Sequence, residues 1–295
     1  MTRNHLGIAM ALLAMLCFAV MDALSKHLVV GTPILQLMWA RAIALALFAA
    51  ALLGRDGLRR ALRARRPWLQ TAVALLLVVE GSIFVLALKY LPLADAHALG
   101  SIAPLLVVAL SALALGEKVG IGRWLAVLAG LCGVFVILRP GFQVFSPALL
   151  IPPGCALLWA IYQISSRFCS QADGPNTTLA WTAFVGLAAT TATIPWNWVT
   201  PDRNTALLIV GTAMLGAAAL FCLIKALHFA RASTIQPFNN SALVWATLLG
   251  YLAFGQAPDS WTVAGAGIIV AAAMFAWHLD LGAPVASDGA LQPSA

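Results

Sequence analysis

Charged side chains are scarce in this 295-residue sequence, where Asp, Glu, Lys and Arg together make up only 9% of the residues. Soluble domains carry about 25% charged residues, which give the folded chain a surface that water solvates. Hydrophobic residues reach 62% here, against roughly 45–50% in soluble domains. The composition argues against a soluble protein and predicts that lipid solvates much of the surface.

The sequence also lacks the motifs of common catalytic and metal sites. It contains no HExxH zinc motif, no GxSxG nucleophile elbow and no phosphate-binding P-loop. Its five cysteines are odd in number and lack metal-ligand spacing. We therefore expect no enzyme, no metal and no cofactor. An intramembrane enzyme is the alternative, and its catalytic group would have to come from His97, Glu80 or Asp22.

Long apolar runs separated by turn residues predict ten transmembrane helices. A helix needs about 20 apolar residues to cross a bilayer, and it satisfies its backbone hydrogen bonds internally. Turn residues such as Gly174 and Pro175 support the segmentation. The predicted spans are residues 6–25, 34–54, 68–89, 94–115, 121–139, 148–168, 177–198, 206–230, 234–254 and 260–279.

Basic residues are distributed unequally between the two sides of such a bundle. Six arginines lie between residues 55 and 66, in a single interhelical segment. Only Lys26, Lys89, Arg139 and Arg203 fall on the other side of the membrane. The positive-inside rule therefore predicts cytoplasmic N- and C-termini in a bacterial inner membrane. A cluster between apolar spans is not the basic stripe of a nucleic-acid-binding domain, so we expect no nucleic acid as partner.

The two halves of the chain repeat a sequence pattern. Residues 87–90 (ALKY) align with residues 226–229 (ALHF) at an offset of 139, and Trp39 aligns with Trp181 at an offset of 142. If each half holds five spans, an odd number, the second half must enter the membrane from the opposite face. Inverted repeats of this kind place a binding site near the midplane, where the halves can expose it alternately to either side.

The predicted fold is therefore an all-α integral membrane protein with ten transmembrane helices in two inverted five-helix repeats. The first repeat covers residues 1–140 and the second covers residues 141–280. Residues 281–295 lack an apolar run and are expected to form a disordered cytoplasmic tail.

The repeated pieces resemble those of EamA-type members of the drug/metabolite transporter superfamily, over nearly all of residues 1–280. The second half departs from the pattern where Gln256 replaces the acid at Glu117 and where Leu243 stands in place of Pro104. The resemblance implies a transporter whose first, third, fourth, sixth, eighth and ninth helices line a central cavity. The matching pieces are Phe18-Ala19 with Lys26, Arg41, Ala87-Leu88-Lys89-Tyr90, Ala103-Pro104, Leu115-Gly116-Glu117 and Gly133-Val134, repeated as Trp159-Ala160 with Arg167, Ala226-Leu227 and Gly255.

Polar side chains at membrane depth are costly, which makes them candidates for substrate binding. Glu80 and Phe84 are one helical turn apart, so they share a face. Packing or helix bridging is the structural alternative for each candidate. The predicted substrate-binding residues are Phe18, Asp22, Glu80, Phe84, His97, Ser101, Trp159, Tyr162, Gln163, Phe221, Asn239, Asn240 and Trp245, with Pro104 and Pro237 as hinges.

Such a lining, largely aromatic and aliphatic with a few polar groups, is typical of a small-molecule pocket. It predicts a secondary transporter that exports small metabolites by alternating access, with broad specificity for apolar or aromatic amino acids. Multidrug efflux, a nucleotide-sugar-type carrier and a channel are the alternatives. The expected partners are the substrate, the bilayer and, through Glu80 or Asp22, protons as a candidate coupling ion. The protein is expected to be a monomer or a homodimer.

Overall fold

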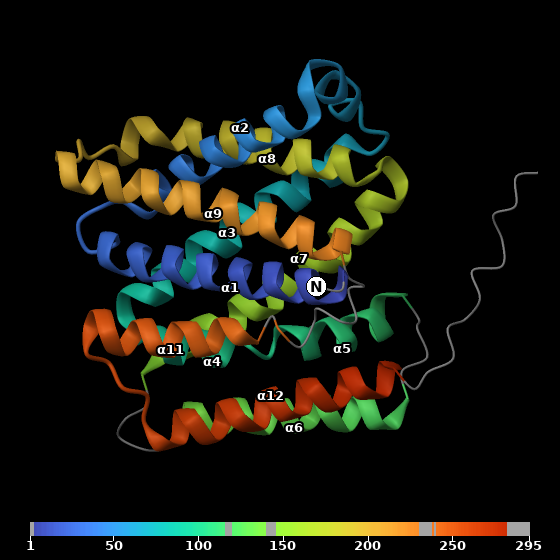
Figure 1. The fold of residues 1–295 in the computed structure, drawn as a ribbon, viewed down its shortest axis with the longest axis vertical. Helices are drawn as coiled ribbons and strands as arrows, with labels where there is room; N and C mark the ends of the chain where they lie inside the picture. Colours follow the sequence, from blue (N-terminus) through green and yellow to red (C-terminus); the bar gives the residue numbers. More distant parts are fainter. Residues whose placement is uncertain (1–2, 116–119, 140–145, 230–237, 239, 282–295) are drawn as a thin grey trace, which may run out of the picture.

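The computed structural model describes residues 3–115, 120–139, 146–229, 238 and 240–281 (Figure 1). Nine candidate spans in this part of the chain are long and apolar enough to cross a membrane, and α11 is a shorter apolar helix. The helical segments are α1 (Arg3–Leu28), α2 (Ile34–Ala61), α3 (Pro67–Tyr90), α4 (Leu93–Gly100), α5 (Ala103–Leu115), α6 (Ile121–Leu138), η1 (Pro147–Leu150), α7 (Ile151–Asp173), α8 (Pro175–Asn197), α9 (Arg203–Phe229), α11 (Ser241–Phe254) and α12 (Ser260–Leu281).

The structure confirms the predicted all-helical membrane fold. Helices α4 and α5 together form one span. With α11 as the tenth crossing, the described helices match the ten predicted spans to within a few residues, apart from two differences described below. The first part of the ninth predicted span, and the predicted tail from residue 282 onward, lie outside the described residues.

The second span extends beyond its predicted end at residue 54. Gly54 adopts a φ of 62°, a conformation that costs glycine little, and the helix resumes after this kink and continues to Ala61. The kink separates the apolar part of α2 from its arginine-rich end. The sequence prediction ended the span where its apolar run ended, and so it missed these last helical turns.

The fourth span is broken, whereas the sequence predicted a continuous helix over residues 94–115. The break lies between Gly100 and Ala103. Pro104 has no N–H and cannot bond to the carbonyl of Gly100, while the Ser101 hydroxyl donates to the Ala98 carbonyl at 2.6 Å. Pro104, the predicted hinge, is the second residue of α5 and so lies directly at this break.

The two halves are inverted repeats, and their helices meet in matched pairs. Helix α1 packs against α9, and its equivalent in the second half, α7, packs against α3, the equivalent of α9. In the same way, α1 packs against α11 and α7 packs against α5. Helix α2 likewise packs on α9 as α8 packs on α3. The pairs α2–α8 and α6–α12 join equivalent helices of the two halves. In Figure 1 the start of α1 and the end of α12 lie on the same side of the bundle, as an even number of crossings requires.

The helices end at two opposite faces of the bundle (Figure 1). The arginine face is the side on which residues 55–66 lie, together with the start of α1. The distal face is the opposite side, which holds the α1–α2 and α3–α4 connections (Figure 1).

Candidate functional site

A cavity of about 560 Å³ lies between the two halves. Its walls come from α1, α2 and α3 of the first half and from α7, α8 and α9 of the second half. The family resemblance implied walls from the fourth and ninth spans, but within the described residues the second and seventh spans (α2 and α8) take their place. A volume in the range of about 300–1,000 Å³ suits a drug-sized ligand.

The cavity extends from the middle of the bundle toward the arginine face. On α3 its lining runs from Ala74 to Gly81, and on α8 from Pro175 to Gly186. The α8 stretch begins at the first residue of that helix, at the arginine face, whereas the α3 stretch lies around the middle of α3, which runs from Pro67 to Tyr90. A ligand in this space would therefore lie at membrane depth.

An aromatic pair on α7 forms part of the cavity wall. The rings of Trp159 and Tyr162 lie 5.3 Å apart between centroids and are tilted by 31°. Phe18 of α1 also lines the cavity. Trp159 is 38% exposed, which leaves ring surface free to stack on a flat group of a ligand.

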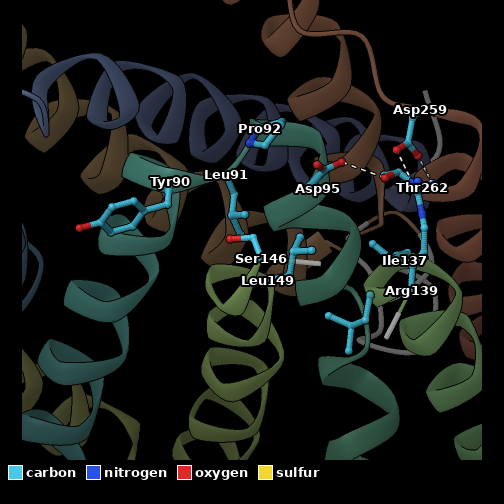
Figure 2. Close-up of a pocket in the computed structure, with 11 residues that line it drawn as sticks. Tyr90, Leu91, Pro92, Asp95, Ile137, Arg139, Ser146, Leu149, Asp259 and Thr262 are labelled. Carbon is cyan, nitrogen blue, oxygen red and sulfur yellow. Dashed lines mark hydrogen bonds and ion pairs between the residues drawn. The ribbon is translucent and has the colours of Figure 1, made fainter. Parts of the chain in front are cut away.

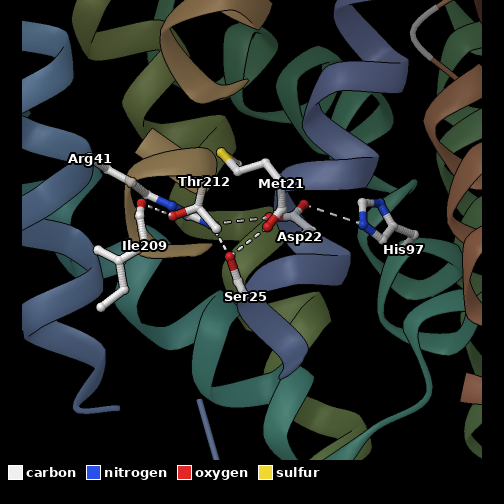
Figure 3. A network of polar contacts seen from close by, with 7 residues as sticks. All are labelled: Met21, Asp22, Ser25, Arg41, His97, Ile209 and Thr212. Carbon is white, nitrogen blue, oxygen red and sulfur yellow. Dashed lines mark hydrogen bonds and ion pairs between the residues drawn. The ribbon is translucent and has the colours of Figure 1, made fainter. Parts of the chain in front are cut away.

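Two side chains of opposite charge line the cavity as well, Glu80 from α3 and Arg41 from α2. The Arg41 Nη2 atom donates to the Ser25 hydroxyl at 2.5 Å and lies 3.6 Å from Asp22 Oδ1 (Figure 3). Asp22 Oδ2 lies 3.4 Å from His97 Nε2 on α4. Asp22 is only 6% exposed, so its carboxylate lies behind Arg41, between the cavity wall and α4.

The structure brings four of the predicted site residues to the cavity: Phe18, Glu80, Trp159 and Tyr162. It brings Asp22 and His97 to the ionic cluster beside the cavity, where Phe84 packs edge-on against the His97 ring at 5.5 Å between centroids. These placements are consistent with the predicted roles without testing them.

The remaining predicted residues lie away from the cavity lining. Gln163 is exposed on α7, Phe221 packs edge-on against Phe48 at 6.3 Å, and Trp245 is partly buried in the apolar cluster that includes Phe18. Ser101 bonds to its own helix, and Asn240 directly precedes α11. Asn239 and Pro237 lie outside the described residues.

Arg41 is the main cavity residue that the site prediction missed. A lone arginine inside an apolar span is itself a signal of function, because an isolated charge in the membrane is costly. Met38, Thr182 and Gly216 also line the cavity. Nothing in their residue types distinguishes them from ordinary packing residues, so only the fold could assign them.

The halves make direct polar contacts at the distal face, beyond the inner end of the cavity. The Gln36 side chain donates to the Val199 carbonyl at 2.9 Å and accepts from the Val199 N–H at 3.1 Å. Trp39 packs edge-on against Trp198 at 5.9 Å between centroids and donates to the Thr191 hydroxyl at 3.0 Å. These contacts join α2 to α8 and to the residues that follow α8, and we call them the distal seal.

A second recess of about 210 Å³ lies at the distal face, between α4, α6 and α12 (Figure 2). Arg139 forms an ion pair there with Asp259, and Asp259 Oδ1 accepts from the Thr262 N–H at 2.7 Å. Thr262 in turn donates to Asp95 of the first half at 3.0 Å. Burial alone would raise the pKa of Asp259, but the bonds from Thr262 and Arg139 outweigh it and hold that pKa below its ordinary value. Arg139 is already paired with Asp259, and Asp95 already accepts from Thr262, which fits a structural link between the halves better than a ligand site.

At the arginine face, Asp173 links the halves at one flank of the cavity. It accepts from the Arg65 backbone N–H at 2.7 Å and from the Gln70 side chain at 3.1 Å. No group of three or more His, Cys, Asp or Glu that could hold a metal ion occurs among the residues that the structure describes.

Comparisons with known proteins agree with this architecture. The EamA-like transporter family matches residues 5–139 and 148–277. A riboflavin transporter of Vibrio cholerae is 30% identical over 276 residues, which cover 91% of this chain and 92% of that protein. An S-adenosylmethionine uptake transporter of Rickettsia prowazekii is 25% identical over 269 residues, covering 91% of each chain. A solved crystal structure matches with a TM-score of 0.61 at 23% identity, over 92% of this chain and 96% of its own, which supports the fold alone.

Proposed function

Since the chain belongs to the EamA-like transporter family, we propose that this membrane transporter carries a small ring-bearing metabolite through the cavity by alternating access. The observation that carries this proposal is a cavity between inverted halves that reaches the middle of the bundle from the arginine face and ends at the distal seal. Inverted-repeat transporters bind substrate at such a midplane position and rock one half against the other around it.

Riboflavin is our first candidate substrate. The Trp159–Tyr162 pair offers a surface on which a flat ring system can stack. The cavity of about 560 Å³ exceeds what a single amino acid needs and suits a drug-sized molecule. The similarity to a riboflavin transporter over most of both chains supports the same choice.

Amino-acid export, the function expected from the sequence, is our second candidate. Its specific support is the presence of Arg41 and Glu80 in one lining. A guanidinium recognises a carboxylate, and a carboxylate recognises an ammonium group. Aromatic amino acids would use this charge pair together with the aromatic wall.

We further propose that the arginine face is cytoplasmic, so that both termini lie in the cytoplasm of a bacterial inner membrane. The segment 55–66 with its six arginines lies on this face, and so do Arg123 at the start of α6 and Arg167 near the end of α7. Lys26, Arg139 and Arg203 lie toward the distal face. In this orientation the end of the cavity at Pro175 faces the cytoplasm, where an exported substrate would load and an imported one would be released.

Transport into and out of reconstituted vesicles tests the proposal. Purified protein should exchange labelled for unlabelled riboflavin, or in the second case labelled for unlabelled aromatic amino acid, with saturation and counterflow. Trp159→Ala should weaken substrate binding by about 1 kcal/mol through lost stacking. Trp196→Ala is the matched control, since Trp196 is 83% exposed and does not line the cavity.

The outcomes separate the candidates. Exchange of only one compound identifies the substrate class, and labelling the arginine segment from one side of the vesicle reports how the protein is oriented in the membrane. If neither compound exchanges, both substrate proposals are wrong. An equal loss in Trp159→Ala and Trp196→Ala would place the binding site elsewhere.

A further inference from the structure

Four ionisable side chains from four helices meet at the inner end of the cavity: Asp22 of α1, Arg41 of α2, Glu80 of α3 and His97 of α4. Asp22 lies between Arg41 at 3.6 Å and His97 at 3.4 Å (Figure 3). Glu80 shares the cavity lining with Arg41 and interacts electrostatically with both Arg41 and Asp22. We call these four residues the charge cluster.

The charges of the cluster do not balance. The two carboxylates carry two negative charges when ionised, and Arg41 carries one positive charge, which leaves one negative charge in excess while His97 is neutral. An unpaired charge at membrane depth is costly, since neither lipid nor packed side chains solvate it. Arg41 is the only basic residue among the described residues that line the cavity, so no second guanidinium or ammonium group balances the cluster there.

Lys26, one helical turn beyond Asp22 on α1, directs its ammonium group to backbone carbonyls of the first half, and the titratable groups on α7 supply no positive charge. On α7, the Cys155 thiol lies 4.0 Å from the Glu80 backbone carbonyl, and the Tyr162 phenol lines the same cavity. Both groups are uncharged when protonated and negative when not. Ser25 contributes only a hydroxyl, which donates to the Met21 carbonyl at 2.6 Å. Neutrality therefore requires one added cation, either a proton or a charged group of a ligand.

The structure offers a proton two kinds of position within the cluster. His97 Nε2 is buried and has no hydrogen-bond partner, although Asp22 Oδ2 lies 3.4 Å away. An N–H on this nitrogen would be a donor directed at the carboxylate, and a second proton on the same imidazole would add the missing positive charge. A proton on Glu80, or on Asp22, would instead remove one of the two negative charges.

We propose that the charge cluster holds one exchangeable proton, and that a positively charged group of a cavity ligand competes with this proton. The inference rests on the proposed function, because it assigns the ligand to the same cavity. When a cation enters, the proton leaves through the cavity to water at the arginine face, and no covalent bond other than that to the proton changes. Proton coupling then follows the net charge of the ligand: a cation releases about one proton, whereas a neutral or zwitterionic ligand releases none.

Two probe compounds of different charge test the competition. S-adenosylmethionine carries one net positive charge at neutral pH, from a sulfonium, an ammonium and a carboxylate group, and riboflavin is uncharged. Each is added to purified protein in weakly buffered lipid nanodiscs that contain a pH indicator, and binding is followed through tryptophan fluorescence. We expect release of about one proton per bound S-adenosylmethionine and none per bound riboflavin.

Conservative variants assign the proton to the cluster. Glu80→Gln removes the excess negative charge while keeping the size of the side chain, so binding of S-adenosylmethionine should release no proton and lose its pH dependence. Asp22→Asn should act in the same way if it folds. Asp56→Asn is the matched control and should behave like the wild type, because Asp56 is exposed on the arginine-rich end of α2. Release that is equal in the wild type and in Glu80→Gln would overturn the proposal.

A measurement without ligand separates this inference from the proposed substrates. The wild type should bind about one more proton than Glu80→Gln over roughly pH 5 to 8, and Asp56→Asn should match the wild type. If neither probe binds but this difference is present, the substrate candidates are wrong and the proton site stands. If the wild type and Glu80→Gln bind the same number of protons, the proton site is wrong whatever is transported.

Discussion

The two ends of the central cavity differ in how the halves of the protein meet. At the distal face, Gln36 and Trp39 of α2 contact Val199, Trp198 and Thr191 directly across the two-fold relation. At the arginine face, Asp173 accepts from Arg65 and Gln70 at one flank, and the cavity lining reaches Pro175, the first residue of α8. Halves that are related to each other thus make different contacts at the two ends of the cavity, and alternating access requires an asymmetry of this kind.

The largest expected effect comes from removing Arg41, the basic side chain in the described lining of the cavity between these two ends. Arg41→Ala should destabilise the protein by about 3–5 kcal/mol, because it leaves Asp22 and Glu80 without their cation at membrane depth. Thermal unfolding in lipid nanodiscs measures this change, and Arg41→Lys, which keeps the charge, should lose less. A stability equal to that of the wild type would show that the ionic contact contributes nothing.

A contact within one half at the distal face should affect stability without opening that face. Lys26 Nζ donates to the Leu88 carbonyl at 2.8 Å and to the Leu91 carbonyl at 2.5 Å, all within the first half. Lys26→Met should cost about 1.5–3 kcal/mol, the value of a hydrogen bond to a charged group. Thiol labelling of a cysteine placed at Val199 should keep its wild-type rate; faster labelling would mean that Lys26 also holds the halves together.

A contact between the halves should shift the balance between the two ends. Trp39→Ala removes an aromatic pair worth about 0.5–1.5 kcal/mol and a hydrogen bond worth about 0.5–1.5 kcal/mol. We expect faster labelling at the distal face and slower labelling of a cysteine placed at Leu77, a partly exposed residue of the cavity lining. Trp196→Ala, at an exposed position on α8, serves as control. Unchanged rates at both sites would remove Trp39 from the distal seal.

The smallest expected effect is a pH dependence of the Arg139–Asp259 link. The pKa of Asp259 is lowered in the folded protein, so its contribution is fully present above the ordinary value of about 3.9 and is lost as the pH falls through the lowered folded value. The side chain of Asp259 is 51% exposed, and such pairs contribute about 1 kcal/mol or less.

Comparing the stability of the wild type with that of Asp259→Asn tests this link. The difference should be present at neutral pH and should disappear in acid. A difference that grew as the pH fell would contradict the sign of the shift.

Local chemistry explains which parts of the fold the sequence could predict. Apolar runs of bilayer length marked the helices, and Pro67 and Pro175 stand at the starts of α3 and α8, where a missing N–H costs nothing. The break at Ser101 and Pro104 was foreseen as a hinge but not as an interruption, because proline can also kink a continuous helix. The end of α2 was missed because its last turns are basic rather than apolar.

Pattern alone could not separate cavity residues from packing residues of the same type. Phe18 and Phe221 both lie in transmembrane spans, but of these two residues only Phe18 lines the cavity. Glu80 was recognised because a carboxylate inside an apolar span is rare, whereas Thr182 and Gly216 have residue types that occur throughout membrane helices. The facing direction of a helix depends on its neighbours, and those neighbours come from the other half of the chain.

The sequence by itself therefore determined the membrane setting, the ten crossings and the inverted halves, because these follow from the transfer energy of each segment and from an odd number of spans per half. Only the tertiary structure decided that Arg41 lies between Asp22 and the cavity, and that α2 and α8 take the place of the fourth and ninth spans in the described walls of the cavity. It also decided that Gln36 and Trp39 join the halves at the distal end. Those features depend on contacts between helices far apart in the chain, which no local pattern of residues specifies.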